Sequence, residues 1–246
     1  MGDNWDDIAS WWNDEAASDP AYRLDVHPLL DELLPGSPGR VVDLGCGEGQ
    51  GMRRVASRAA GEGDRQRRER VFGVDLSTEL ASAASTAGPV VVAELPALAC
   101  FRDEAFDTAY SVYLLDLIED HAGFFAEGAR VVRQGGAMVL VINHPAYTAP
   151  GSAPLMDDDG EVLWRWGDYF RVGSSLEPAS NREIRFHHRP LGELLTAAAS
   201  AGWVLDTLIE RGLSADTISE LPGYEGQHDI PRLLGVRWIR DVSWRM

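Results

Sequence analysis

Lysine is missing from this chain of 246 residues, and its 22 basic side chains are all arginines. Acidic residues number 39, so the formal net charge is −17 at pH 7. A protein that binds phosphate backbones gains affinity when Lys and Arg displace counterions, and this surface would repel them instead. The charge balance therefore argues against nucleic acid as a partner. The one arginine cluster, at residues 65–70, is flanked by glycines and acids and is expected to be a solvated loop.

Cysteine and long apolar runs are also scarce. Cys46 and Cys100 cannot form a disulfide framework, so both are expected to be reduced thiols in a cytoplasmic protein. No apolar run has the roughly 20 residues needed to span a bilayer, and the first residues are acidic, unlike a signal peptide. We therefore expect no membrane partner. At this length a single domain over residues 1–246 is expected.

The most informative stretch is residues 41–49. A short β-branched run ends in Asp43, turns on three alternate glycines and enters a helix-compatible segment at residues 50–60. A second short strand follows and ends in Asp75. Strand, glycine turn, helix, strand and acid form the layout of a nucleoside-binding βαβ unit. Glycines let the backbone approach a ligand closely, and Asp75 is placed to accept both hydroxyls of a ribose.

Two details of the turn select among nucleoside ligands. The glycines alternate, whereas a turn that cradles a pyrophosphate has the spacing G-x-G-x-x-G. The acid before the turn, Asp43, would repel a pyrophosphate but suits an ammonium group. A ligand with a ribose, a cationic amino-acid part and no phosphate satisfies both conditions. S-adenosylmethionine is such a ligand.

Residues 43–49, Asp-Leu-Gly-Cys-Gly-Glu-Gly, closely resemble motif I of the class I, Rossmann-like methyltransferases. The resemblance covers roughly residues 5–238. Residues 111–120, 143–145 and 187–191 look like a bacterial subgroup with methyltransferase-11-type domains, which includes many small-molecule methyltransferases. The resemblance implies that S-adenosylmethionine is the cofactor.

The resemblance also implies a set of cofactor contacts. Asp43 reaches the methionine amino group, and the backbone of the glycine turn packs against methionine and ribose. Leu76 stacks on the adenine beside Asp75. The family's usual acid after the third strand is replaced by an apolar residue, so Ala93 and Glu94 are assigned to the adenine. Ser111 should border the sulfonium. The full predicted set is Trp12, Asp43, Gly45, Cys46, Gly47, Gln50, Asp75, Leu76, Ala93, Glu94 and Ser111.

Apolar strands alternate with helices along the chain, which predicts an α/β fold. We expect a doubly wound, mostly parallel seven-stranded sheet with helices on both faces. The expected strands are residues 41–43, 71–75, 89–93, 106–111, 137–143, 203–210 and 233–239, and the expected helices are 28–34, 50–60, 77–87, 119–132 and 190–201.

Two segments fall outside this alternation. Residues 4–15 carry three tryptophans, and four apolar side chains share one helical face. Residues 1–34 are therefore expected to form a helical lid over the cofactor cleft, or to pack only on their own domain. Residues 146–189 are expected to be a cap inserted between strands five and six, with short antiparallel strands. Its aromatic residues, Trp164, Trp166, Tyr169 and Phe170, are predicted to form an apolar pocket or, for about half of them, the small core of the cap itself.

Three residues are candidates for the chemistry. Methyl transfer from a sulfonium is an in-line displacement, so a base is needed only for a protonated acceptor. His144 follows strand five and could be that base, or it could cap the strand and orient the next turn. His187 and its neighbour lie in the cap on opposite faces of a strand, so at most one faces the cleft. Asp116 could bind the acceptor or act as a solvated helix cap. No third ligand has metal-site spacing, so we expect no metal.

The sequence limits the acceptor without naming it. Residues 111–114 read Ser-Val-Tyr-Leu and lack the Asn-Pro-Pro-Tyr tetrapeptide that holds planar amino groups of DNA bases or glutamine. The expected function is methyl transfer to an oxygen or nitrogen of a small organic molecule by a monomer or homodimer. One alternative is methylation of a modified wobble base of tRNA. Another is a cofactor-binding regulator or cyclase on the same fold that transfers no methyl group.

Overall fold

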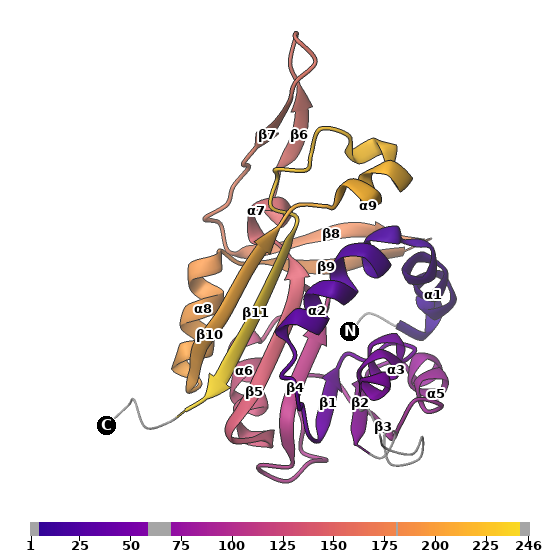
Figure 1. Ribbon diagram of the computed structural model, residues 1–246, viewed down its shortest axis with the longest axis vertical. Helices are drawn as coiled ribbons and strands as arrows, with labels where there is room; N and C mark the ends of the chain where they lie inside the picture. The colour runs from indigo at the N-terminus through magenta and orange to yellow at the C-terminus, as the bar shows by residue number, and fades with distance from the viewer. Residues whose placement is uncertain (1–4, 59–69, 181, 242–246) are drawn as a thin grey trace.

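A computed structural model describes residues 5–58, 70–180 and 182–241. Its central sheet consists of β1 (Val41–Leu44), β2 (Val71–Asp75), β3 (Val90–Val92), β4 (Phe106–Val112), β5 (Val132–Asn143), β10 (Trp203–Arg211) and β11 (Leu233–Arg240). The strand order is β10-β11-β5-β4-β1-β2-β3 (Figure 1). The five strands from β5 to β3 are parallel, and β11 is antiparallel to both of its neighbours. The expected mostly parallel, seven-stranded sheet is confirmed.

Alternation along the strands builds a core on each face of the sheet. On β5, Met138, Leu140 and Ile142 pack with α6 (His121–Val131) and α8 (Leu191–Ser200). Val139 and Val141 point the other way and pack with α2 (His27–Leu33) and α3 (Gln50–Ser57). A strand buried on both faces reads as a continuous apolar run, which explains why β5 carries no polar alternation. The helix α5 (Thr78–Ala84) contacts β2 and β3.

The start of β5 differs from the prediction. β5 begins at Val132, although residues 134–136 were expected to stop a helix and leave the strand to start at 137. The pairing of β5 with β4 is irregular between the pairs made by Phe106 and by Thr108 of β4. In this part of β5, Gly135 adopts φ +72°. The two glycines therefore make a bulge instead of a break. Ser77 caps α5 as expected, because its side chain accepts from the Leu80 N–H at 3.1 Å.

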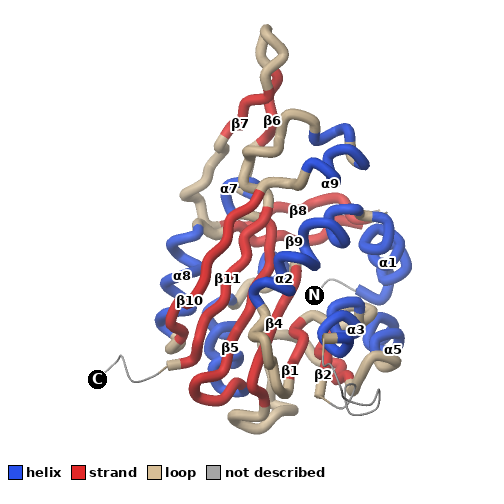
Figure 2. The backbone as a smooth tube through the Cα atoms, in the orientation of Figure 1, coloured by secondary structure: helices blue, strands red, loops and turns tan. Residues whose placement is uncertain are grey.

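The segment between β5 and β10 contains the predicted short antiparallel strands. After the short helix α7 (Pro145–Thr148), β6 (Ala153–Met156) pairs with β7 (Val162–Arg165), and β8 (Gly173–Ala179) pairs with β9 (Arg182–His188). The β6–β7 ribbon projects from the body, whereas the β8–β9 ribbon lies across the carboxyl ends of the central strands (Figure 2). Outside these ribbons, the chain also forms the short turns η3 (Leu115–Leu117) and η4 (Pro222–Tyr224) and the helix α9 (Ala215–Glu220).

The N-terminal segment connects the two sides of this carboxyl edge. It comprises η1 (Trp5–Ile8), α1 (Ala9–Ser18) and a π-helical turn, η2 (Tyr22–Val26). Asp6 accepts from the hydroxyls of Ser77 at 2.5 Å and Thr78 at 2.6 Å, and these bonds lower the pKa of its carboxyl to about 2. Asp7 forms a salt bridge of 2.5 Å with Arg182 on β9. The segment therefore spans from the start of α5 to the β8–β9 ribbon.

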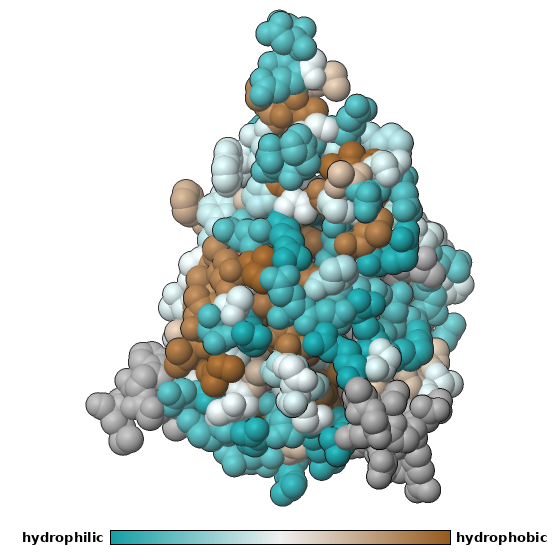
Figure 3. All heavy atoms as spheres, in the orientation of Figure 1, coloured by the Kyte–Doolittle hydropathy of each residue, from teal (hydrophilic) through white to brown (hydrophobic). Residues whose placement is uncertain are grey.

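The surface is mostly hydrophilic on the face shown in Figure 3, with an apolar region over β10, β11 and α8. Val204 and Leu205 of β10 are exposed. Within the described ranges, no helix has both the length and the apolar character needed to cross a membrane. The expected arginine loop lies, apart from Arg70, outside the described residues.

Candidate active site

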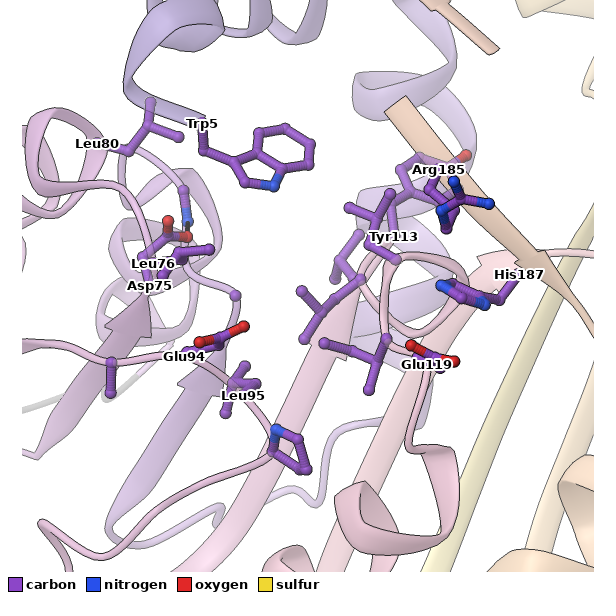
Figure 4. Close-up of a pocket in the computed structure, with 18 of the residues that line it drawn as sticks. Trp5, Asp75, Leu76, Leu80, Glu94, Leu95, Tyr113, Glu119, Arg185 and His187 are labelled. Atoms are coloured by element: carbon purple, nitrogen blue, oxygen red, sulfur yellow. Dashed lines mark hydrogen bonds between the residues drawn. The ribbon is translucent and has the colours of Figure 1, made fainter. Parts of the chain in front are cut away.

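A cavity of about 430 Å³ opens at the carboxyl edge of the parallel strands. Its walls come from the glycine turn after β1, the loops after β2, β3 and β4, the N-terminal segment and β9. Figure 4 shows two ends, with Asp75, Leu76 and Glu94 at one and Tyr113, Arg185, His187 and Glu119 at the other. Ligands of open α/β sheets bind at this edge, so the position agrees with the topology.

Asp75 organises the first end of the cavity. Its carboxylate accepts the Gly47 N–H at 2.7 Å and the Ser77 N–H at 2.9 Å. Burial raises the pKa of this carboxyl despite those bonds. A carboxylate has about four lone-pair positions, so two N–H donors leave acceptor capacity for ligand hydroxyls. Leu76, 39% exposed, lies beside it, and Ala93 and Glu94 line the same wall.

The glycine turn presents its backbone to the cavity, as predicted. Gly45 and Gly47 adopt φ +78° and +53°, which favour glycine. A Cβ on Gly47 would meet only the Trp12 indole nitrogen at 3.8 Å, so it would occupy the cavity itself. The Cys46 side chain points into the core beneath Gly73, and burial raises the pKa of its thiol well above the usual value. Cys46 therefore contributes only its main chain.

A second, narrow cavity of about 60 Å³ adjoins the first. Trp12, Gly45, Gly47 and Val112 line both cavities, and the narrow one extends to Gln50 and to the buried Asp43. The Asp43 carboxylate accepts the Tyr110 hydroxyl at 2.5 Å. Burial raises the pKa of Asp43 to about 7, with nearby Asp75 and Glu48 adding to the effect. A cation placed here would favour the ionised carboxylate.

At the second end, β9 sends alternate side chains into the cavity. Arg185 and His187 line it, as residues i and i+2 on one face of a strand should. His188 lies on the other face, buried, with its Nε2 2.8 Å from the carbonyl of Tyr169. The prediction that only one of the two histidines faces the cleft is confirmed, and that residue is His187.

Arg189 joins the two walls of this end. Its buried guanidinium donates to the carbonyls of Leu115, at 3.2 Å, and Glu119, at 2.9 Å, and also to that of Ile118. A longer contact of 3.5 Å reaches the His187 carbonyl. One side chain therefore holds the loop after β4 against the end of β9. Charged hydrogen bonds of this kind are stronger than neutral ones, so the cavity wall is well fixed.

Residues 42–140 match the model of a family described as a methyltransferase domain. The fold also resembles a solved S-adenosylmethionine-dependent methyltransferase from Mesorhizobium loti, with a TM-score of 0.73 and 29% identity over 87% of this chain and 96% of that one. This chain therefore contains a methyltransferase domain at residues 42–140, and its fold is that of the class I S-adenosylmethionine-dependent methyltransferases. Its cofactor is S-adenosylmethionine.

Two curated methyltransferases are also similar. The ubiquinone biosynthesis O-methyltransferase of Paracidovorax citrulli is 29% identical over 92% of this chain and 89% of its own. The phosphatidylethanolamine N-methyltransferase of Cereibacter sphaeroides is 32% identical over 43% of this chain. The chain spans about half the length of that N-methyltransferase, 51%, and 36% of another matched relative.

The geometry of the two cavities also fits S-adenosylmethionine, independently of the similarity to known proteins. Asp75, the expected acceptor of the ribose hydroxyls, and the apolar Leu76 lie together at one end of the larger cavity. The main chain at Gly47 leaves space that a Cβ would fill. Asp43 offers a carboxylate at the narrow cavity, where an ammonium would be received. These residues suit a nucleoside with a cationic amino-acid tail.

Two predicted site residues lie elsewhere. Ser111 is fully buried and donates to the Leu44 carbonyl at 2.9 Å, because β4 continues to Val112. Val112, Tyr113 and the residue after it line the cavity instead. Asp116 lies behind the cavity, with its Oδ2 buried and unpaired among the described residues, so it is neither a solvated cap nor in the cavity lining. Burial raises the pKa of Asp116 to about 7, although Arg189 and Arg232 oppose the shift.

The aromatic residues of the inserted segment also lie away from the cavity. Trp164 stacks on Tyr147 with ring centroids 4.9 Å apart. Trp166 and Phe170 are 60% and 86% exposed. The Tyr169 hydroxyl accepts the Leu191 N–H at 3.1 Å. Trp166, Tyr169 and Phe170 line a separate pocket at residues 166–171, so the aromatic residues of this segment do not form part of the cavity at the carboxyl edge.

His144 lies outside both cavities and is nearly buried, at 5% exposure. Its Nδ1 accepts the Ala146 N–H at 3.0 Å, which caps α7. Its Nε2 lies 2.7 Å from Glu210 Oε1 on β10. An Nδ1 that accepts a hydrogen bond leaves the proton of neutral imidazole on Nε2, which then donates to Glu210. The geometry supports the structural alternative for His144 and removes it from the candidate bases.

We expect His144→Ala to destabilise the fold by ~1–3 kcal/mol, because the Ala146 N–H and Glu210 each lose a partner. Methyl transfer per folded molecule should stay unchanged. His144→Asn is the matched variant, since asparagine is a good helix N-cap and should recover part of the melting temperature. A loss of turnover with an unchanged melting temperature would return His144 to the catalytic site.

The sequence interpretation missed four residues at the second end of the cavity, namely Tyr113, Glu119, Arg185 and Arg189. A signal for Arg185 was present, since it alternates with His187 on a strand whose other face carries Ile184 and His188. Nothing local indicates Arg189, whose partners lie about 70 positions away. Among the described residues, no group of three or more His, Cys, Asp or Glu side chains is placed to hold a metal.

Proposed function

We propose that this protein transfers the methyl group of S-adenosylmethionine to an oxygen or nitrogen of a small organic molecule. The observation that carries the proposal is the cavity of about 430 Å³, which has Asp75 at one end and His187 at the other. A volume of this size suits a small molecule. We also propose a cytoplasmic monomer or homodimer that acts without nucleic acid or membrane.

Each end of the cavity has its own part in the reaction. The cofactor supplies a methyl group activated on a sulfonium. Asp75 and the glycine turn hold the nucleoside part, and Asp43 pairs with the amino group. His187 Nδ1 or Nε2 takes the proton from a hydroxyl or ammonium acceptor, while the wall at Tyr113 and Leu117 excludes water. Positioning of the two reactants supplies most of the acceleration.

The proposal is tested by incubating the full chain with methyl-labelled S-adenosylmethionine and an extract of its own cells. Label should enter the small-molecule fraction. Label in tRNA would favour the wobble-base alternative. Cofactor binding without transfer to any fraction would favour the regulator or cyclase alternative.

The N-terminal segment is proposed to act as a lid. Trp5 and Trp12 line the cavity, and their rings meet edge to face with centroids 5.9 Å apart. Removal of the residues before Ser18 should lower both cofactor affinity and turnover, because water then enters the site. Asp7→Asn is the milder variant, since it only weakens the link to Arg182. Normal kinetics in the truncated protein would show that the segment only packs.

Cofactor affinity should depend on pH through Asp43. Because the pKa of Asp43 is about 7, this carboxyl is largely protonated at pH 6 in the free protein. The ammonium group of the bound cofactor favours the ionised carboxylate. Binding must then release a proton, so affinity should fall roughly five- to tenfold between pH 7.5 and pH 6.

Calorimetry measures this pH dependence of affinity, and Asp43→Asn should bind the cofactor weakly with no such slope. Tyr110→Phe removes the donor that lowers the pKa and should move the midpoint upward. An equal slope in Asp43→Asn would assign the titration elsewhere.

A further inference from the structure

Arg185 is unusual for its position. The chain is strongly acidic, and the cavity wall carries the carboxylates of Asp75, Glu94, Glu119 and Asp120. Among the described residues that line the cavity, Arg185 is the single arginine. It lies at the end opposite Asp75, next to His187 on β9 (Figure 4). An acidic cavity that contains one guanidinium has a defined place for an anionic group.

The surroundings of Arg185 fix its position. Its Nη1 donates to the hydroxyl of Ser174 on the paired strand at 2.9 Å. Asp120, an acid on the same wall, is engaged by the N-terminus of α6, where it accepts the Gly123 N–H at 2.8 Å. In the view of Figure 4, Glu119 and Arg185 are drawn on either side of His187. A planar guanidinium suits a carboxylate or sulfonate, which it binds through two parallel bonds.

The spacing of Arg185 and His187 along β9 indicates how long a molecule must be to contact both. Arg185 and His187 are two residues apart on one face, which corresponds to roughly 7 Å along a strand. Tyr113 and Leu117 also line this cavity and add apolar surface to it. A molecule with its anionic group at Arg185 and its accepting heteroatom at His187 needs an apolar body about as long as one aromatic ring.

We propose that the methyl acceptor is an organic acid, with its anionic group bound by Arg185 and its hydroxyl or amino group held at His187. The two groups are separated by about one aromatic ring. This inference rests on the proposed function and narrows its substrate class. Arg185 is then a specificity residue of the acceptor end, with no part in holding the cofactor.

The test uses the full chain saturated with S-adenosylhomocysteine and two probes, 4-hydroxybenzoate and 4-hydroxybenzamide. The probes have the same ring and hydroxyl but differ in charge. Calorimetry should show the acid binding at least ~10-fold more tightly than the amide, as expected for a charged hydrogen bond. Arg185→Gln should abolish that difference and leave the amide unaffected. Arg171→Gln is the control, because Arg171 lies outside the cavity lining and its side chain is 72% exposed.

Several results would overturn the proposal. Equal affinity for the two probes in the unaltered protein would do so, as would binding of neither probe or a preference for the acid that survives in Arg185→Gln. Weaker binding of S-adenosylhomocysteine in Arg185→Gln would assign the residue to the cofactor's carboxylate. Failure of the proposed function is seen separately, as no heat with S-adenosylmethionine or no labelled small molecule in the extract. An acid preference lost only in Arg185→Gln, with cofactor affinity intact, supports the proposal.

Discussion

Replacement of His187 by alanine should lower the rate of methyl transfer by ~10²–10⁴-fold and leave the affinity for S-adenosylmethionine nearly unchanged. His187 lines the acceptor end of the cavity, whereas the cofactor residues Asp75 and Leu76 lie at the other end. A base that acts on the acceptor contributes to turnover and not to cofactor binding. Single-turnover transfer to the labelled acceptor, together with calorimetry, measures the two quantities separately.

The pH dependence of this variant gives a second readout. The loss should shrink for an acceptor that is already deprotonated at the assay pH, because that acceptor needs no base. His228→Ala is the matched control, since that histidine lies outside the cavity lining and its side chain is 65% exposed. Full activity in His187→Ala would leave positioning alone as the mechanism. Equal losses for protonated and deprotonated acceptors would indicate a steric role for the imidazole.

The assignment of His187 over His144 shows where sequence reasoning ends. His144 follows a predicted strand and His187 lies within one, and sequence position alone does not separate a base from a cap. The distinction depends on Glu210, which is 66 positions from His144 in the sequence. The Oε1 of Glu210 lies 2.7 Å from the Nε2 of His144. It also depends on the β8–β9 ribbon, which lies over the carboxyl ends of the central strands and carries His187 into the cavity. Both contacts are set by tertiary packing.

The cofactor end was more predictable because its signals are local. Glycine is needed where φ is positive, and Gly45 and Gly47 have that conformation within five residues of Asp43. Ser111 shows the limit of this reasoning. β4 runs one residue further than expected, so the side chains that follow Ser111 line the cavity and the serine bonds within the sheet. An error of one position at a strand end therefore assigns the cavity lining to the wrong residue.

A mostly parallel, seven-stranded sheet was predictable because apolar runs and glycine turns alternate along the chain. The placement of the inserted ribbons was not. Most partners of Arg189 lie about 70 positions away in the sequence, and through them Arg189 holds the loop after β4 against the end of β9. Trp166 and Phe170 are exposed and line a pocket separate from the main cavity, because aromatic composition does not indicate where in the fold a pocket lies.

Asp75→Ala should weaken S-adenosylmethionine binding by ~10–100-fold. Two ribose hydroxyls lose a charged acceptor worth about 1.5–3 kcal/mol, and the Gly47 and Ser77 N–H groups lose the carboxylate that orders the turn. Calorimetry gives the affinity, and the melting temperature without cofactor reports the second effect separately.

Glu94→Gln is the matched variant for Asp75→Ala, because Glu94 lies on the same wall but has an exposed side chain. Its effect should be smaller, since glutamine keeps an oxygen acceptor for the adenine amino group. Asp75→Asn should resemble the alanine variant, because an amide presents N–H groups to a site where two main-chain N–H donors converge. Unchanged affinity in Asp75→Ala would remove this residue from the ribose site, and heat on addition of NAD to the unaltered protein would contradict the choice of cofactor.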